Sequence, residues 1–323
     1  MKLLITGCAG FIGYHLSKKL LEMGHQIIGL DNLNNYYDVN LKRKRIQLLK
    51  SLKVKKKYFI FKKIDISNKN KLIQELGNHK FDAIVNLAAQ AGVRYSIKYP
   101  NKYYETNVQG FFNILELSRI TKVKHLVYAS TSSVYGNIKK LPFKEDSNCK
   151  PIQFYAATKL ANESMATAYS EIYKIKTTGF RFFTVYGPMG RPDMALFKFS
   201  ENILKNKPIK VFNYGNHTRD LTYIDDIVQG VVNSIILKTS YSSEVFNLGC
   251  SKSIGLMKIV QLLKKNYNKK ILIDYVKFQQ GDIKNTKSSI IKAKKLLNYN
   301  PKTTPSNGIK LFCDWFKIYH EKK

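Results

Sequence analysis

Residues 1–13, MKLLITGCAGFIG, decide the fold of this chain. The apolar run KLLIT at 2–6 predicts a β-strand, and the apolar residues that follow Gly13 continue at helical spacing. Gly7, Gly10 and Gly13 lie on the turn between the two elements. Glycine allows this turn to be tight and lets backbone N–H groups approach a pyrophosphate at the start of the helix. The segment therefore predicts a dinucleotide site at the first strand-to-helix turn.

Short apolar runs alternate with longer helical segments from residue 1 to about residue 182. We expect strands at 2–6, 26–30, 58–62, 82–87, 125–130 and 177–182, and long helices at about 101–121 and 154–174. This order predicts an α/β fold with a Rossmann-type doubly wound parallel sheet. Beyond Arg181 the alternation ends in loops rich in Asn, Gly and Pro, with one helix expected near 196–205.

The length of 323 residues predicts two domains. The first covers residues 1–182, with a returning segment near 215–240, and binds the nucleotide. The second is a smaller C-terminal α/β domain, mainly residues 183–323, that faces the substrate. Because no low-complexity linker separates them, we expect the two domains to pack tightly on each other.

Asp31 ends the second expected strand, 18 residues after Gly13. A carboxylate at this place accepts hydrogen bonds from an adenosine ribose. Its negative charge repels a 2′-phosphate, so the expected cofactor is NAD rather than NADP.

The composition, 44% hydrophobic and 24% charged, is that of a folded globular protein, and the net charge is +33. Of the 55 basic residues 48 are Lys and only 7 are Arg. Proteins that recognise nucleic acid rely on Arg for bidentate contacts, so we expect a solvated, lysine-rich surface and no specific nucleic-acid partner. No apolar run approaches the roughly 18 residues that cross a bilayer, so no membrane insertion is expected.

The densest basic segment is LKRKRIQLLKSLKVKKK at 41–57. Its apolar residues Ile46, Leu48, Leu49 and Leu52 predict the buried stripe of an amphipathic helix with a basic outer face. Contact of this segment with an anionic membrane or RNA is the alternative.

The four cysteines, Cys8, Cys149, Cys250 and Cys313, are far apart and have no histidine at metal-ligand spacing. We therefore expect a reduced, cytoplasmic protein with no metal site. The apolar start carries no Ala-x-Ala cleavage site, so we interpret it as part of the mature protein.

The GxxGxxG spacing of the first turn resembles that of the extended short-chain dehydrogenase/reductase family. Asp65-Ile66 after the third strand resembles the adenine contact of that family, and Asn86-Leu87-Ala88-Ala89 after the fourth resembles its NAD-binding strand end. The resemblance implies an NAD site made by Gly7, Gly10, Phe11, Ile12, Gly13, Asp31, Asn32, Asp65, Ile66, Leu87, Ala88 and Ala89, completed by a catalytic Tyr-x-x-x-Lys pair.

Five tyrosines match the Tyr-x-x-x-Lys pattern: Tyr14, Tyr58, Tyr135, Tyr155 and Tyr319. Only Tyr155 begins a long helix, so that Lys159 lies on the same face, and it follows the hydroxyl-rich end of the fifth strand. A nearby ammonium stabilises a phenolate and moves the pKa of Tyr155 from near 10 toward neutrality.

We therefore predict Tyr155 as the catalytic base and Lys159 as the cation that supports it and holds the nicotinamide ribose. The Thr131 hydroxyl is expected to relay a proton or position the substrate, and Ser132 and Ser133 to orient a sugar.

Six stretches resemble the UDP-glucuronate 4-epimerases, and they extend over essentially the whole chain. They are LAAQAGVRYSI (87–97), YASTSSVYG (128–136), YAATKLANE (155–163), RFFTVYGPMGRPDMALFKF (181–199), RDLTYIDDI (219–227) and QQGDIKNT (279–286). The resemblance implies NAD-dependent interconversion of UDP-glucuronate and UDP-galacturonate, by transient oxidation at carbon 4 and hydride return to the opposite face. It also implies a homodimer formed through the helices at 101–121 and 154–174.

By the same resemblance Thr184 and Arg191 bind the sugar carboxylate, and Arg94 belongs to the AGVR loop. Arg219 and Asp282 match positions that bind the uridine diphosphate. One position departs from the family pattern: Thr286 is followed by Lys-Ser-Ser rather than by a segment ending in Asp, so one nucleotide contact is expected to be lost.

Chemistry supports Arg191 independently. Oxidising carbon 4 of a uronic acid makes a β-keto acid, which loses carbon dioxide readily when the bond to the carboxylate stands perpendicular to the ketone. A guanidinium that binds the carboxylate at two points can hold it in an unreactive orientation.

Several alternatives remain open at this point. One is a UDP-glucuronate decarboxylase, which shares the fold, NAD and the Tyr/Lys pair. Others are a 4-epimerase of a UDP-N-acetylhexosamine or hexosaminuronate, and an epimerase for another uronate carbon. Outside enzymes, the basic charge is compatible with an NAD-sensing or RNA-associated scaffold.

Overall fold

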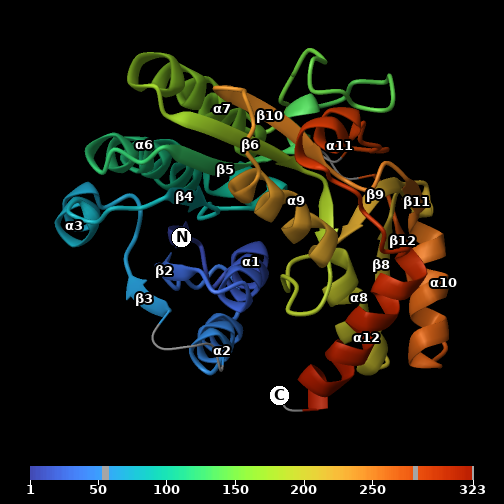
Figure 1. Ribbon diagram of the computed structural model, residues 1–323. Coiled ribbons are helices and arrows are strands. Elements are labelled where there is room, and N and C mark those ends of the chain that lie inside the picture. Colours follow the sequence, from blue (N-terminus) through green and yellow to red (C-terminus); the bar gives the residue numbers. More distant parts are fainter. Residues whose placement is uncertain (53–57, 279–282, 322–323) are drawn as a thin grey trace.

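The computed structural model describes residues 1–52, 58–278 and 283–321. A parallel seven-stranded sheet forms its centre, in the order β10-β6-β5-β4-β1-β2-β3 (Figure 1). The strands are β1 (Lys2–Thr6), β2 (Gln26–Asp31), β3 (Phe59–Lys63), β4 (Ala83–Asn86), β5 (His125–Thr131), β6 (Lys176–Phe182) and β10 (Ser243–Leu248). The predicted Rossmann-type fold and its first six strands are confirmed. The strand order changes direction between β1 and β4, where such sheets open a crevice for ligands.

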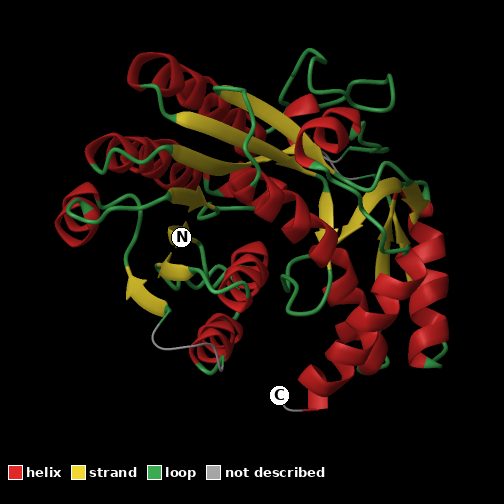
Figure 2. Cartoon of the chain, in the orientation of Figure 1, coloured by secondary structure: helices red, strands yellow, loops and turns green. Residues whose placement is uncertain are grey.

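Helices cover both faces of the sheet (Figure 2). Within β1, Leu3 and Ile5 belong to one hydrophobic cluster and Leu4 to another, because successive side chains point to opposite faces. The first cluster includes residues of α1 (Phe11–Glu22), α2 (Val39–Lys50) and α9 (Ile224–Ile236), and the second includes residues of α3 (Lys69–Leu76), α6 (Gly110–Ile120) and α7 (Phe154–Tyr173). Burial on both faces explains why these strands are almost continuously apolar.

The helix expected at 101–121 is divided into α5 (Pro100–Tyr103), a π-helical turn (Tyr104–Gln109) and α6. The π-helical turn carries Asn107, whose amide donates to Gln90 O and Thr158 Oγ1, both at 3.1 Å. Gln90 N donates to Asn107 Oδ1 in return, at 2.8 Å. Asn107 therefore joins the segment that follows β4 to α7. The helix expected at 154–174 corresponds to α7.

The remaining elements form two small sheets and a set of helices beside the central sheet (Figure 1). The strands are β7 (Thr184–Tyr186), β9 (Thr218–Tyr223) and β11 (Ser253–Gly255) in one sheet, and β8 (Ile209–Phe212) and β12 (Ile273–Val276) in the other. The helices are α4 (Val93–Lys98), α8 (Ala195–Leu204), α10 (Leu256–Tyr267), α11 (Ile291–Leu297) and α12 (Pro305–Glu321).

The chain returns to the central sheet after β9 (Thr218–Tyr223). Helix α9 packs against α1, but the strand that joins the central sheet is β10, just beyond residue 240. The division into domains at residue 182 stays a prediction.

The predicted basic helix exists as α2, and its apolar stripe packs against the core as expected. Its basic side chains do not all face outward, however, because Lys42 is 5% exposed and Arg45 is fully buried. The outer face carries the exposed Arg43, Lys44 and Lys50, as expected, whereas Lys42 and Arg45 find hydrogen-bond partners inside the protein. Residues 53–57 of the segment lie outside the described residues.

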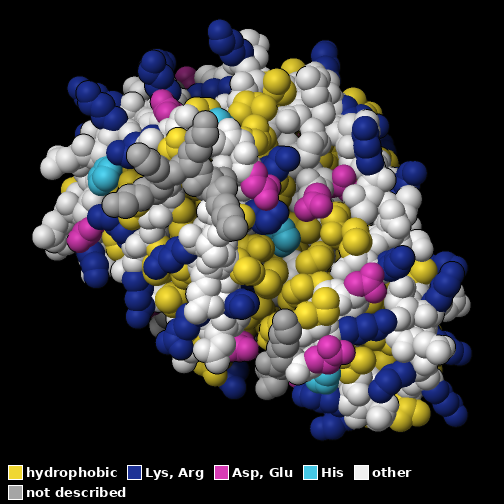
Figure 3. All heavy atoms as spheres, turned by 60° about the horizontal axis from the view of Figure 1, so that its bottom comes forward, with side chains coloured by type: hydrophobic (Ala, Val, Ile, Leu, Met, Phe, Trp, Pro, Cys, Tyr) yellow, Lys and Arg dark blue, Asp and Glu magenta, His cyan; other side chains and the backbone are white. Residues whose placement is uncertain are grey.

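Lys and Arg side chains are spread over the face shown in Figure 3 rather than gathered in one patch. Among the described residues, no helix has both the length and the hydropathy needed to cross a membrane. All four cysteines are free thiols.

Candidate active site

A cavity of about 1080 Å³ opens at the carboxyl ends of the central strands. It extends from the glycine-rich turn to β8, β9 and α8. Every predicted site residue that the structure describes lines it: Gly7, Gly10, Phe11, Ile12, Gly13, Asp31, Asn32, Asp65, Ile66, Leu87, Ala88, Ala89, Arg94, Thr131, Ser132, Ser133, Tyr155, Lys159, Thr184, Arg191 and Arg219. Asp282 lies outside the described residues.

The glycine-rich turn brings α1 close to the end of β1. Gly7 has a φ of +69°, and a Cβ atom at Gly13 would lie 2.1 Å from the Gly7 carbonyl oxygen. No larger residue fits there without displacing the backbone. Gly10 at the N-cap supplies no side-chain cap, so the first N–H groups of α1 remain for a bound anion. This geometry suits the pyrophosphate of a dinucleotide.

Asp31 is 8% exposed and accepts hydrogen bonds from the backbone N–H groups of Leu33, at 2.8 Å, and Ala9, at 3.2 Å. Burial raises the pKa of Asp31, and the ammonium of Lys42 and these two N–H donors oppose the rise. Lys42 also lines the cavity, and its Nζ donates to Asn34 O and Oδ1, both at 2.8 Å. Sequence reasoning missed Lys42, because one Lys among 48 carries no distinguishing signal.

Asn32 and Asp65 form a second polar pair beside Asp31. Asn32 Nδ2 donates to Asp65 Oδ2 at 2.7 Å, and the Ser67 N–H and hydroxyl donate to Asp65 Oδ1. Burial acts to raise the pKa of Asp65, but the hydrogen bonds from Asn32 and Ser67 outweigh it and lower the pKa. The groups needed to bind an adenosine therefore lie together at one end of the cavity.

Tyr155 lies in the first turn of α7, and Lys159 follows one turn later on the same face. Lys159 is 2% exposed, and its ammonium donates to Ala129 O at 2.9 Å. Burial lowers the pKa of Lys159 to about 8, and the nearby Glu163 carboxylate acts in the opposite direction. Burial therefore disfavours the charged form of Lys159, which lines the cavity.

The structure differs from the expected electrostatics of Tyr155. Burial raises the pKa of Tyr155, whereas the Arg191 charge and a hydrogen bond with Thr131 lower it. The pKa was expected to move toward neutrality under the influence of Lys159. Desolvation of the phenolate outweighs the favourable charges, of which that of Arg191 acts most strongly on Tyr155.

A buried ion pair fixes α7 to the sheet behind Lys159. Arg181 on β6 donates to both carboxylate oxygens of Glu163, at 3.0 and 2.7 Å. The Ser130 hydroxyl on β5 donates to Glu163 Oε1 at 2.5 Å. Because Glu163 lies one turn after Lys159, this pair determines which face of α7 meets the cavity.

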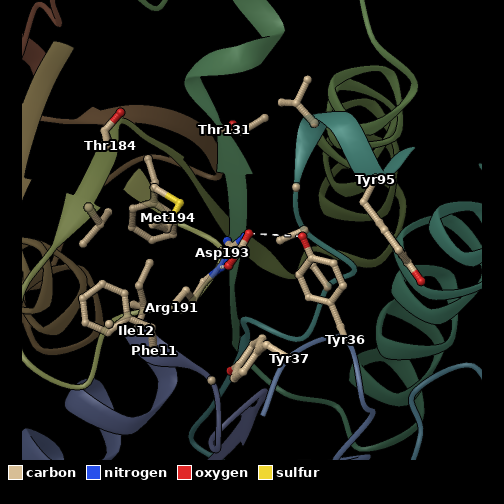
Figure 4. Close-up of a pocket in the computed structure, with 18 of the residues that line it drawn as sticks. Phe11, Ile12, Tyr36, Tyr37, Tyr95, Thr131, Thr184, Arg191, Asp193 and Met194 are labelled. Carbon is tan, nitrogen blue, oxygen red and sulfur yellow. Dashed lines mark hydrogen bonds and ion pairs between the residues drawn. The ribbon is translucent and has the colours of Figure 1, made fainter. Parts of the chain in front are cut away.

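Arg191 already has a carboxylate partner in its own loop. Its Nε donates to Asp193 Oδ1 at 3.0 Å and its Nη2 to Asp193 Oδ2 at 2.5 Å. Tyr36 donates its hydroxyl to Asp193 Oδ2 at 3.1 Å, and Figure 4 shows the three side chains together in the cavity with Thr131 and Thr184. Sequence reasoning did not identify Asp193 and Tyr36. The spacing Arg-Pro-Asp was a usable signal for Asp193.

Arg94 and Arg219 lie toward the other end of the cavity. The Arg94 guanidinium lies over the Phe212 ring, 4.8 Å from its centroid. Arg219 Nη1 donates to Thr218 O and Lys284 O, at 3.0 and 2.9 Å.

The segment after Thr286, which departs from the family pattern, serves a structural purpose. Ser288 donates to Asp220 Oδ2 through its N–H, at 2.9 Å, and through its hydroxyl, at 2.5 Å. Asp220 also accepts N–H bonds from Cys250 and Ser251. Ser288 therefore helps to connect β9 to neighbouring loops and supplies no carboxylate to the cavity.

The model of the NAD dependent epimerase/dehydratase family matches residues 3–249. The chain belongs to this family. It is 42% identical over 316 residues to a UDP-glucuronate 4-epimerase of Thermodesulfobacterium geofontis, and the match covers 97% of this chain and 95% of that protein.

Solved structures agree with this membership. The structure is similar to that of a UDP-glucuronic acid 4-epimerase from Bacillus cereus in complex with UDP-glucuronic acid and NAD, with a TM-score of 0.92 and 35% identity over 99% of this chain and 100% of that one. It is also similar to a UDP-glucose 4-epimerase from Thermotoga maritima, with a TM-score of 0.88 and 29% identity over 99% of this chain and 100% of that chain. The predicted family and its NAD cofactor are confirmed.

Proposed function

We propose that this protein interconverts UDP-glucuronate and UDP-galacturonate by transient oxidation at carbon 4 of the sugar. One observation carries the proposal: Arg191 and Thr184, suited to a carboxylate, line the same cavity as Tyr155, Lys159 and Thr131. The named relatives with UDP-glucuronate 4-epimerase activity support the same substrate. The decarboxylase and N-acetylhexosamine alternatives have no comparable support.

Tyr155 is the base that takes the proton from the 4-hydroxyl and later returns it. Its hydrogen bond with Thr131 gives that proton a path between the substrate hydroxyl and the phenol. Lys159, held by Ala129 O, supplies a positive charge beside the nicotinamide end. Bound NAD supplies the oxidising chemistry at carbon 4.

The glycine-rich turn, Asp31, Asn32, Asp65 and the end of β4 hold the dinucleotide. The buried carboxylate of Asp31 accepts hydrogen bonds from the ribose hydroxyls, and the Lys42 ammonium stabilises the negative charge of Asp31. Since the cofactor returns to its starting state in each cycle, tight retention of NAD is an advantage.

Arg191 and Thr184 bind the sugar carboxylate, and Ser132 and Ser133 orient the sugar. Holding this group close to the plane of the 4-ketone slows the loss of carbon dioxide, which separates an epimerase from a decarboxylase. Arg219 and Asp282 bind the uridine diphosphate, and Arg94, in the AGVR loop, contributes to substrate binding.

We further propose a cytoplasmic homodimer formed through α6 and α7. Large apolar side chains lie exposed on these helices and on the π-helical turn before α6, as expected of a surface that another subunit covers. They are Tyr104, Phe112, Ile172 and Tyr173.

Comparison of kcat/KM for several UDP-sugars tests the proposed substrate. We expect kcat/KM for UDP-glucuronate to exceed that for UDP-glucose and UDP-N-acetylglucosamine by about 10²-fold or more, because a buried charge pair is lost with the neutral sugars. Arg191→Ala should remove most of this preference. Equal use of the three substrates by the wild type would overturn the proposal.

A further inference from the structure

The cation that we assign to the substrate carboxylate is already bound to another carboxylate. Asp193 occupies the Nε and Nη2 side of the Arg191 guanidinium with both of its oxygens. This bidentate pair leaves the Nη1 side of the planar group for a second carboxylate. The two side chains are each 24% exposed, so the pair lies at the cavity wall and not in bulk solvent.

Asp193 is itself held in place from a distant part of the chain. Tyr36, in the segment after β2, donates its hydroxyl to Asp193 Oδ2 at 3.1 Å. The Tyr36 ring lies 4.8 Å from that of Tyr95, and its hydroxyl is so close to Gly92 that a Cβ atom there would lie 2.3 Å away. Tyr36 therefore has little freedom to move.

Tyr36 also remains a hydrogen-bond donor at neutral pH. Burial raises the pKa of Tyr36, and the negative charge of Asp193 adds to the rise. Tyr36 and Arg191 therefore both donate to Asp193, one from each side, and Arg191 is the residue that we assign to the substrate carboxylate.

We propose that Asp193, oriented by Tyr36, is a positioning residue that fixes the plane of Arg191 and thereby suppresses loss of carbon dioxide from the 4-keto intermediate. The inference rests on the proposed function. In the suppressed side reaction the bond between carbon 5 and the carboxyl carbon breaks and carbon dioxide leaves. The electron pair stays on carbon 5, which then takes a proton, so that the product is a UDP-4-keto-pentose.

The charges of Asp193 and Arg191 distinguish orientation of the guanidinium from electrostatic attraction of the substrate. Asp193 cancels the charge of Arg191 in the free protein, so its presence weakens the pull on an anionic substrate while it fixes the direction of the guanidinium. Removing the Asp193 charge therefore leaves uronate binding no weaker, but frees Arg191 to rotate with the carboxylate.

The test compares Asp193→Asn and Tyr36→Phe with wild type and with Asp314→Asn, which makes the same chemical change on an exposed residue of α12 outside the cavity. Each protein is incubated with UDP-glucuronate, and carbon dioxide, UDP-4-keto-pentose and UDP-galacturonate are quantified together with KM. Circular dichroism confirms that each variant is folded.

Asp193→Asn should raise the ratio of carbon dioxide to UDP-galacturonate roughly tenfold, with a KM no higher than that of wild type. Tyr36→Phe should raise the ratio by roughly threefold, because only one of the fixing contacts is lost. Asp314→Asn should leave it unchanged. A role limited to folding would lower all products together and leave the ratio at its wild-type value.

The outcomes distinguish this inference from the proposed function. If wild type forms UDP-galacturonate but neither variant changes the ratio, the inference is wrong and the proposed function stands. If Asp193→Asn does not fold, the ratio of carbon dioxide to UDP-galacturonate measured with Tyr36→Phe decides whether the inference holds. If wild type does not convert UDP-glucuronate, the proposed function fails and the inference fails with it.

Discussion

Arg45 on α2 donates a 2.7 Å hydrogen bond to the main-chain oxygen of Met189, two residues before Arg191. The same buried guanidinium donates to Ala9 O, in the glycine-rich turn, at 2.7 Å, and to the Tyr37 hydroxyl at 2.8 Å. One side chain thus connects the turn that receives the dinucleotide with the loop that carries Arg191. The nucleotide and carboxylate ends of the cavity are therefore not independent.

Replacing Arg45 by Lys should disturb both the nucleotide end and the carboxylate end of the cavity. A single ammonium cannot span Ala9 O and Met189 O, so buried carbonyls lose their donors, and we expect a loss of about 2–4 kcal/mol in the free energy of unfolding. Denaturant titration measures this loss. Arg43→Lys, the same change on an exposed face of α2, is the matched control and should change stability by less than about 0.5 kcal/mol. Equal stability of the two variants would contradict the bridging role.

The sequence predicted α2 but not the purpose of its basic residues. Periodicity identified the buried stripe through Ile46 and Leu49, because apolar burial repeats with the helix. It did not identify Arg45 as buried, since nothing local distinguishes a buried Arg from a solvated one. The partners of Arg45 come from Ala9 and Met189, which only the tertiary fold brings together.

Tyr155→Phe should lower kcat by about 10²–10⁴-fold, because the ring remains but the proton acceptor is lost. NAD binding, measured by fluorescence or by cofactor retained on purification, should remain. Tyr58→Phe is the matched control, since Tyr58 also begins a Tyr-x-x-x-Lys sequence but lies outside the cavity. Near-wild-type turnover by Tyr155→Phe would remove Tyr155 as the base.

Lys159→Met should be inactive and yet more stable than wild type. Burial lowers the pKa of Lys159 from 10.5 to about 8, which corresponds to a cost on the order of 3 kcal/mol for keeping the ammonium in the folded state. The variant also loses the hydrogen bond to Ala129 O, which offsets about 1 kcal/mol of the stabilisation. We therefore expect the free energy of unfolding to rise by roughly 2 kcal/mol at pH 7.

The pH dependence of that gain tests its origin. Below pH 8 the wild-type amine is protonated in both the folded and the unfolded protein, and the full cost is present. Between about pH 8 and 10.5 the folded protein loses this proton before the unfolded chain does. The wild type therefore regains stability, and the difference in unfolding free energy between it and Lys159→Met shrinks. A difference that stays constant from pH 7 to 10.5 would show that the ammonium is not the cause.

His15 should contribute to acid denaturation. Its Nε2 lies 2.9 Å from Pro188 O, and burial lowers the pKa of His15 from 6.5 to about 4. The unfolded chain therefore binds a proton first, and stability falls as the pH drops from 6.5 toward 4. His15→Gln keeps a donor for Pro188 but cannot titrate, so its unfolding free energy should depend less on pH in this range, by at most about 3 kcal/mol. Identical pH profiles for variant and wild type would contradict a neutral, half-buried His15.

The candidate site was predictable where a motif carries its own chemistry. The three glycines, Asp31 and the Tyr155/Lys159 pair follow from spacing and from their places at strand ends, and all of them line the cavity. Long-range contacts were not predictable, because Tyr36 and Asp193 are 157 positions apart in sequence. The pKa of Tyr155 was expected in the wrong direction for a related reason: desolvation depends on how the folded chain surrounds the phenol.

Incubation of the purified protein with UDP-glucuronate, without added cofactor, tests the central claim most directly. Nuclear magnetic resonance of the sugar products is combined with an assay for carbon dioxide. Formation of UDP-galacturonate without gas is the predicted result and would show that NAD is retained through purification. A UDP-pentose accompanied by carbon dioxide, or unchanged UDP-glucuronate even after NAD is added, would contradict the account.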